Sequence, residues 1–166
     1  MRLHIQLLTL LVAAVLLAGC SFHLRGQATI PFQTLYLKAA NPGTPFIKEL
    51  SRNLEANNVK LVDSAVKADV VLDIVAEIPD KQILSLSGSG RVNEYQLFYR
   101  VSLRAYDRDQ YDVIPAEEVE MHSDFPYDDS NVLAMESEEA LLYQNLRSDL
   151  VQRIVRRLSR VKLKPR

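Results

Sequence analysis

Hydrophobic and polar residues follow a two-residue period in some stretches of the chain and a helical period in others. A period of two puts alternate side chains on opposite faces of a strand, whereas repeats at three and four residues line one face of a helix. The clearest alternation covers residues 95–105, and residues 70–78 and 119–125 show it more briefly. Residues 34–37 are also rich in strand-forming side chains. The pattern therefore predicts about four strands.

Two of these strands are predicted to form a long antiparallel hairpin. Pro79 interrupts the first alternation, and the strand resumes at residues 83–86. Gly88-Ser89-Gly90 then provides a turn signal before the strand at 95–105. The third strand follows the polar loop 107–112. Along the first strand, the period predicts one apolar face, formed by Val70, Leu72, Ile74, Ala76 and Ile78.

Two segments have the periodicity and the end signals of helices. Thr44-Pro45 combines a hydroxyl N-cap with proline at the first helical position, and Asn57-Asn58 suits the exit from a helix. A second, longer helix is predicted to begin near Ser130. Its apolar stripe consists of Leu142, Leu146, Leu150, Ile154 and Leu158.

The order strand, helix, strands, helix, with one apolar face on the strands, predicts an α+β fold. We expect a two-layer sandwich in which a mostly antiparallel sheet of about four strands packs against two helices. In this arrangement Tyr99 and Val101 on the hairpin face Leu146 and Leu150 on the long helix. The chain of 166 residues has no internal repeat, and its length suits one core rather than two.

Residues 1–19 have the pattern of a cleaved export signal. Residues 5–17 are almost wholly apolar, and about 20 Å of helix is too short for a ~30 Å hydrocarbon core. A basic start and the small pair Ala18-Gly19 favour a signal peptide over a spanning helix. Cys20, the only cysteine, follows at once and is the predicted lipidation site. The alternative is a cytosolic protein with a buried N-terminal helix and a small core cysteine.

The predicted mature chain, residues 20–166, is a single domain anchored at Cys20. Once that thiol is acylated no disulfide is possible, so that packing must stabilise the fold. Apolar residues return at Phe22, and a strand begins near Thr34, so that about 14 residues span at most ~50 Å. The domain is therefore expected to lie against its membrane. The formal net charge of −1 indicates no particular charged partner, and an exported chain does not meet nucleic acid.

No group of residues in the sequence has the pattern of an active site. His122 and Asp124 lie two apart on a strand and point to one face, but a metal or acid–base site needs a third converging group. A solvated strand is the simpler interpretation. No serine has a partner histidine in a recognisable setting, and residues 88–90 lack the lysine and the following helix of a phosphate loop. We therefore expect no enzyme activity, no cofactor and no metal.

The end of the long helix is strongly basic. Seven of the last fourteen residues are Lys or Arg, with no acid among them. A solvated face that complements the helix macrodipole is the ordinary explanation. The alternative is a contact with anionic lipid headgroups or lipid A phosphates. The four arginines opposite the apolar stripe are Arg153, Arg156, Arg157 and Arg160.

Three short motifs follow one another in the order found in a known family. Residues 20–26 read CSFHLRG, residues 94–97 read EYQL, and residues 132–134 and 138–143 read VLA and EEALLY. They resemble the opening CGFHLRG, the EYQL hairpin strand and the start of the long helix in the LptE family. This family comprises lipopolysaccharide-assembly lipoproteins of Gram-negative outer membranes. The resemblance extends over the whole chain.

The resemblance implies a two-layer α/β domain plugged inside the LptD β-barrel as a 1:1 complex. The pair would insert lipopolysaccharide into the outer leaflet. The expected location is the periplasmic side of the outer membrane, held there by the lipid on Cys20, and Ser21 fits sorting to that membrane. The competing function is a free-standing periplasmic ligand-binding or inhibitor lipoprotein. A small hydrolase is a third and weaker alternative.

The resemblance also implies direct lipopolysaccharide binding by basic residues near the hairpin turn and at the helix start. Arg91, beside the turn, is the counterpart of the first, although a solvated arginine on a hairpin is the simpler reading. The basic residue implied at the helix start is missing, because this chain has Met135 where relatives often have lysine. The lipopolysaccharide-binding candidates are Arg91, Arg153 and Arg157. The partner-interface candidates are three aromatic residues on or near the polar side of the hairpin, Phe98, Tyr106 and Tyr111.

Overall fold

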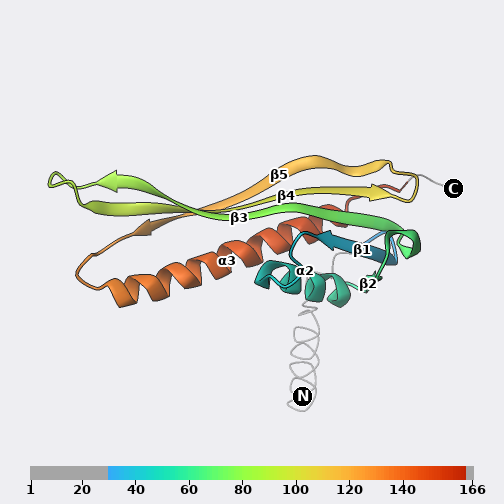
Figure 1. Ribbon diagram of the computed structural model, residues 1–166, viewed down its shortest axis with the longest axis horizontal. Helices are drawn as coiled ribbons and strands as arrows, with labels where there is room; N and C mark the ends of the chain where they lie inside the picture. The colour runs from blue at the N-terminus through green and yellow to red at the C-terminus, as the bar shows by residue number, and fades with distance from the viewer. Residues whose placement is uncertain (1–29, 164–166) are drawn as a thin grey trace, which may run out of the picture.

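The computed structural model describes residues 30–163, and the predicted signal segment and Cys20 lie outside them. The elements are β1 (Thr34–Ala39), α2 (Pro45–Ala56), β2 (Lys60–Leu61), the 3₁₀ turn η1 (Ala65–Lys67), β3 (Val70–Leu86), β4 (Val92–Asp107), β5 (Asp112–Pro126) and α3 (Val132–Leu158). Both helices lie on the same face of one sheet (Figure 1). The predicted two-layer α+β fold is confirmed.

The sheet has five strands in the order β2-β1-β3-β4-β5, where the sequence predicted about four. The additional strand, β2, has two residues and pairs in parallel with β1. Strand β1 also pairs in parallel with β3, whereas β3, β4 and β5 form an antiparallel meander. The sequence did not predict β2 because two residues are too few to show a hydrophobic period.

The β3–β4 hairpin is long and closes at the predicted turn. The backbone N–H of Ser87 donates to the carbonyl of Arg91 at 2.7 Å, and Gly90 adopts a positive φ of 80°, a conformation that glycine accepts without strain. Pro79 does not interrupt β3. Pairing with β1 ends at Ile74. Beyond it β3 is the edge strand of the described sheet, where proline is tolerated because no other described strand pairs with that side.

A β-bulge between Ile74 and Ala76 corrects the predicted apolar face of β3. The extra residue shifts the two-residue period, so that Glu77 pairs with the buried Val101, and Ile78 pairs with Arg100 on the opposite face. Ile78 is consequently 46% exposed rather than in the core. The prediction was right up to Ile74 and wrong for Ala76 and Ile78.

The predicted end signals of α2 are confirmed. The hydroxyl of Thr44 accepts a hydrogen bond from the backbone N–H of Ile47 at 3.2 Å, and Pro45 occupies the first helical position. The helix ends at Ala56, and Asn58 beyond it has a positive φ of 63°. Its buried face packs into the core through Phe46, Ile47, Leu50 and Leu54.

The long helix α3 begins at Val132, close to the predicted Ser130, but its two halves are not equally buried. The six buried residues all lie in the second half: Leu146, Leu150, Val151, Ile154, Val155 and Leu158. Leu142, which the sequence placed in the same stripe, is only partly buried. Tyr99, Val101, Leu146 and Leu150 belong to the same buried cluster, as predicted.

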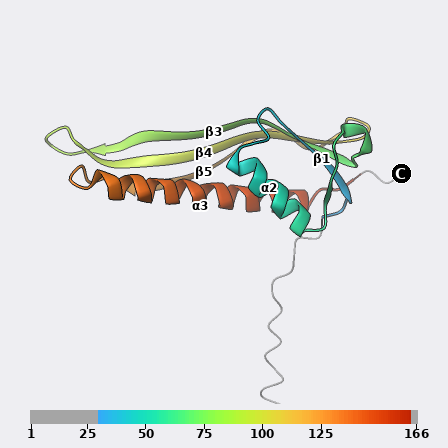
Figure 2. The same cartoon turned by 60° about the horizontal axis from the view of Figure 1, so that its bottom comes forward.

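The domain is elongated and has two parts. We call proximal the part that contains β1, β2, α2, the second half of α3 and the strand segments that these elements cover. We call distal the part beyond the bulge at residues 74–76, where the hairpin tip and the first half of α3 extend past α2 (Figures 1 and 2). Two helices cover the sheet only in the proximal part, and α3 alone covers it in the distal part.

Candidate functional site

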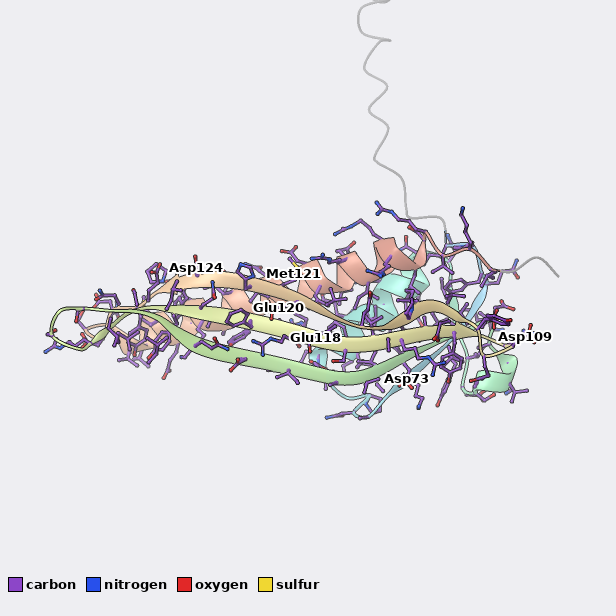
Figure 3. All side chains as sticks on the ribbon, turned by 90° about the horizontal axis from the view of Figure 1, so that it is seen from above. Asp73, Asp109, Glu118, Glu120, Met121 and Asp124 are labelled. Atoms are coloured by element: carbon purple, nitrogen blue, oxygen red, sulfur yellow. The ribbon has the colours of Figure 1, made fainter. Side chains whose placement is uncertain are left out.

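The outer face of the sheet, which neither helix covers, carries arginines from β4 between carboxylates from its two neighbouring strands. The Nε of Arg100 lies 2.6 Å from Glu120 on β5, and its Nη1 lies 3.4 Å from Asp80 on β3. Arg104 pairs on one side only, with Asp112 at the start of β5. Figure 3 shows this face, with Asp73 on β3 and acidic side chains along β5. These pairs are partly exposed, so that each contributes little to stability.

Two of the partner-interface candidates, Phe98 and Tyr106, lie on this outer face and are half-buried. The guanidinium of Arg100 lies 4.9 Å from the centre of the Phe98 ring, and that of Arg104 lies at the same distance from Tyr106. Tyr111 is 61% exposed beside the β4–β5 turn. Since eight strand residues span about 27 Å, Phe98 is remote from the two tyrosines. The three aromatics do not form one patch.

His122 and Asp124 project from β5 onto the same outer face, but they do not converge. The His122 ring lies 6.0 Å from the Phe98 ring, and Asp124 accepts a hydrogen bond from the Gln96 side chain at 2.8 Å. Within residues 30–163, no three His, Cys, Asp or Glu side chains gather in a way that could hold a metal ion. The surroundings of this pair are those of a solvated strand.

Arg91 lies at the distal end of the molecule, immediately after the hairpin turn. Its side chain is 74% exposed, and its Nη1 lies 3.6 Å from a carboxylate oxygen of Asp129, just before α3. The backbone N–H of Arg91 donates to the Ser87 hydroxyl at 3.0 Å. The guanidinium is therefore free to turn toward a ligand, although Asp129 offsets part of its charge.

Met135, where the resemblance implied a lysine, is partly buried against the core. Glu136 beside it is exposed. The start of α3 thus contributes a packing residue and a negative charge instead of a second cation near Arg91. Lys81, the next cation along β3 in this part, is held in an ion pair with Glu139 at 2.7 Å, so that Arg91 is the more available of the two for an anion.

Arg153 and Arg157 lie at the other end of the domain. They line a groove of about 720 Å³ between the first residues of β5 and the end of α3. One side of the groove is apolar and includes Val113, Ile114 and Pro115. The other side is basic and carries Arg153, Arg156, Arg157, Arg160 and Lys162. We call this feature the basic groove.

The three lipopolysaccharide-binding candidates therefore belong to two separate places. Arg91 is close to Asp129 at the start of α3, whereas Arg153 comes 21 residues after Val132, about 30 Å further along the helix. The structure brings Arg153 and Arg157 together and leaves Arg91 apart. A single lipid headgroup does not span that distance.

The distal end also exposes apolar side chains that the sequence did not indicate. Ile83, Leu84 and Leu86 near the hairpin tip are between 44% and 58% exposed, and Leu133 at the start of α3 is 79% exposed. The alternation alone suggests that such residues face a core. The signal that could have revealed them is length, because the predicted hairpin is much longer than the first helix and must extend past it.

A polar cluster at the boundary between the two parts was also not predicted. Glu77, moved to the helix side by the bulge, accepts hydrogen bonds from the hydroxyls of Tyr99 and Thr44. Burial and the hydrogen bond to Glu77 raise the pKa of Tyr99 well above its usual range. The cluster joins the start of α2 to β3 and β4, so that its role is structural.

Among residues 30–163, no helix combines the length and the apolar character that a membrane span requires. The arrangement offers three surfaces for binding: the distal apolar end with Arg91, the paired-charge outer face, and the basic groove.

Comparison with known proteins gives consistent results. The model of the family LptE, described as lipopolysaccharide-assembly, matches residues 32–158. The LPS-assembly lipoprotein LptE of Yersinia pestis is 31% identical over 161 residues, which cover 95% of this chain and 77% of the relative. This match includes most of the residues outside the described part.

Two solved structures are similar in both fold and sequence. The solution structure of an uncharacterized lipoprotein B from Nitrosomonas europaea has a TM-score of 0.72 and 36% identity, covering 84% of this chain and 90% of that one. The crystal structure of rare lipoprotein B from Shewanella oneidensis has a TM-score of 0.67 and 27% identity, covering 74% of this chain and 91% of that one.

Proposed function

Since this chain belongs to the LptE family of lipopolysaccharide-assembly lipoproteins, we propose that it plugs the LptD β-barrel and helps to deliver lipopolysaccharide to the outer leaflet. A role in lipopolysaccharide transport follows from the family. The barrel partner, the 1:1 complex and direct lipid binding are the parts that we propose. The protein acts without catalysis, as a structural partner and a lipid-binding surface.

The observation that carries this proposal is the extent of the family match. It covers residues 32–158, which include every strand and helix described here. The relative from Yersinia pestis is named a lipoprotein, and we propose the same anchor for this chain, at Cys20 on the periplasmic side of the outer membrane.

The distal part has the properties of a surface that another protein covers. Beyond Ile74 the edge of β3 has no strand partner in the described part of the chain, and exposed apolar side chains lie along the same segment. Unpaired strand edges and exposed apolar patches favour contact with other chains. We propose that this end lies inside the barrel, with Phe98 on the adjoining outer face. Tyr106 and Tyr111 would then contact the barrel near its periplasmic opening.

Purification of the membrane-extracted full chain tests the central proposal. A plug inside a barrel buries far more than the roughly 1,600 Å² of a standard interface. We therefore expect the chain and LptD to remain a 1:1 pair through detergent extraction and gel filtration. Recovery of the chain only as a free monomer, beside an unassociated barrel, would support the free-standing periplasmic lipoprotein instead.

A pair of matched variants tests which end enters the barrel. Ile83→Ser with Leu86→Ser removes two exposed apolar side chains from the distal end, and Val66→Ser removes one that is 89% exposed on η1 in the proximal part. We expect the distal variant to lose barrel association and Val66→Ser to keep it, with both variants folded. Equal association of both variants would place the interface elsewhere.

A further inference from the structure

We propose that the basic groove at the end of α3 binds the phosphate of an anionic phospholipid headgroup, taken from the membrane in which Cys20 is anchored. The proposal rests on the lipid anchor of the proposed function. It does not depend on LptD or on lipopolysaccharide, because the end of α3, whose residues line the groove, and the hairpin tip lie at opposite ends of the domain (Figure 1).

Within residues 30–163, most of the positive charge in the groove has no acidic partner, although the Arg153 guanidinium donates to the sulfur of Met121 at 3.6 Å. Arg157 pairs with Glu117 on β5. Among residues 30–163, no carboxylate lies within ion-pair distance of the other four cations, although Asp149 also lines the groove. These four are Arg153, Arg156, Arg160 and Lys162. An anion from outside the domain would complete the site.

The spacing of the arginines on α3 has a cost when no anion is present. Arg153 and Arg157 are four residues apart on α3, and like charges at this spacing destabilise a helix, although the ion pair of Arg157 with Glu117 offsets part of this repulsion. The helix macrodipole offsets the repulsion only near the last turn, which contains Arg156 and Arg157. Arg153 lies before that turn. The macrodipole therefore does not account for the whole cluster.

The two walls of the groove match the two parts of a phospholipid headgroup. Guanidinium groups bind phosphate oxygens in a bidentate manner, and the Lys162 ammonium adds a point charge. On the opposite wall, the partly exposed Val113 and the exposed Pro115 offer an apolar surface to the glycerol and the first acyl methylenes, with the buried Ile114 behind them. A free phosphate ion would leave this apolar wall unused.

The position of the groove indicates which membrane surface it meets. The start of β1 pairs with the start of β3, and the start of β3 pairs with the end of β4. Because β5 begins beside the end of β4, β1 and β5 begin at the same end of the sheet. Figures 1 and 2 show the end of α3 at this end as well. Cys20 precedes Ile30 by ten residues, at most about 35 Å of extended chain. The anchor therefore holds the groove close to the headgroups of its own leaflet.

Binding at the groove would orient the domain. A lipid anchor on a short tether limits how far the domain lies from the membrane, but it does not fix the orientation of the domain. A second contact at the end of α3 would keep the long axis of the domain from lying flat on the membrane surface. The hairpin tip and Arg91 would then lie at the end of the domain that is farthest from these headgroups.

Lipid titration of the full chain in a non-ionic detergent, followed by native mass spectrometry, tests the proposal. The probes are dioleoyl phosphatidylglycerol and dioleoyl phosphatidylcholine. The groove variant combines Arg153→Gln, Arg156→Gln and Arg160→Gln and keeps Arg157, which pairs with Glu117. Each cation near an anionic lipid surface raises the affinity about fivefold. We therefore expect the groove variant, which lacks three cations, to bind phosphatidylglycerol roughly 100-fold more weakly than the wild type.

The control variant removes three exposed cations elsewhere, through Lys48→Gln, Arg52→Gln and Lys60→Gln, and should bind like the wild type. Equal binding by the groove variant and the wild type would overturn the proposal, as would equal binding of the two lipids. Competition by inorganic phosphate at the same concentration as the lipid would indicate a simple anion site and would also overturn it. So would occupancy of the groove by lipopolysaccharide alone.

A parallel purification separates this proposal from the proposed function. We expect the groove variant still to associate with LptD, because its substitutions lie far from the distal end. Loss of phosphatidylglycerol binding together with an intact complex supports both proposals. Absence of the complex in the wild type would contradict the plug and leave the lipid measurement as an independent test of the groove.

Discussion

The proximal and distal parts of the domain share three strands and one helix, yet they bury these elements to different extents. In the proximal part α2 and α3 together cover the sheet, and all six buried residues of α3 lie there. In the distal part α3 alone covers it, and Met135, Leu142 and Tyr143 are only partly buried. One helix is too narrow to cover a sheet of several strands. Apolar side chains of the distal part therefore remain exposed beside the helix.

The distal part compensates with aromatic contacts. Tyr95 and Phe125 stack with ring centres 6.5 Å apart, and Tyr127 meets both edge-on. Such pairs add roughly 0.5–1.5 kcal/mol each beyond area burial. The comparison indicates a division of roles: the proximal part holds the fold together, and the distal part keeps apolar surface available for a partner.

The largest expected effect is on the proximal core. Leu150→Ala should lower the free energy of unfolding by about 2–5 kcal/mol, because Leu150 is fully buried and the substitution leaves a cavity. Leu142→Ala, on the same stripe of α3 in the distal part, should cost less than half as much. Thermal and denaturant unfolding measure both. Equal losses would remove the distinction between the two parts, and the exposed-site control Arg156→Ala should change little.

A smaller effect is expected at the boundary cluster. Tyr99→Phe removes the hydroxyl that donates to Glu77, and we expect a loss of about 1–2 kcal/mol, since Glu77 keeps only the Thr44 partner. Tyr95→Phe is the matched distal change, because among the described residues no hydrogen bond involves the Tyr95 hydroxyl. Chemical denaturation of the two variants should separate them clearly. A Tyr99→Phe protein as stable as Tyr95→Phe would show that this cluster does not stabilise the attachment of α2 to β3 and β4.

Acid should weaken the proximal part first, through the contact between its two helices. Partial burial works to raise the pKa of Glu49, but hydrogen bonds from Ser148 and Arg147 outweigh it and hold that pKa below its usual range. A depressed folded-state pKa adds stability above about pH 4.5, and this stability is lost as pH falls through the folded pKa. Glu49→Gln should therefore be less stable at pH 7 and less sensitive to acid.

Asp128 gives the distal counterpart of this experiment. Hydrogen bonds from Ser130 hold its pKa below the usual range as well, but they join residues only two apart in an exposed loop. Asp128→Asn should therefore change the acid dependence of unfolding less than Glu49→Gln does. Unfolding midpoints measured between pH 3 and pH 7 compare the two variants, and a larger effect at Asp128 would contradict the expected order.

The smallest effect on stability is expected at the hairpin tip. Arg91→Asp should leave the unfolding midpoint nearly unchanged, because the side chain is exposed and its one ion pair is long. If Arg91 contacts lipopolysaccharide, the same change should weaken binding of the purified lipid, and the loss should shrink as salt screens the charge. Binding assays at low and moderate salt test this. Unchanged lipid binding would remove Arg91 from the site.

The sequence alone determined most of the elements and several of their ends, but not the short strand β2 or the continuity of β3 through Pro79. The alternation at 95–105, the turn at 88–90 and the cap at Thr44-Pro45 each appear in the structure where they were predicted. These signals are local, since the period of a strand, the φ of a glycine and the hydroxyl of an N-cap act within a few residues. The family motifs are local in the same sense, and the family they indicated is confirmed.

Only the tertiary structure decided which residues each face buries and which charges meet. The bulge after Ile74 moved Glu77 inward and Ile78 outward, and no local period predicts where a strand slips against its neighbour. The position of α2 over one end of the sheet exposed the apolar hairpin tip. Packing α3 against β5 formed the basic groove and separated Arg153 from Arg91. These features depend on contacts between residues far apart in the chain, which the spacing of hydrophobic residues does not encode.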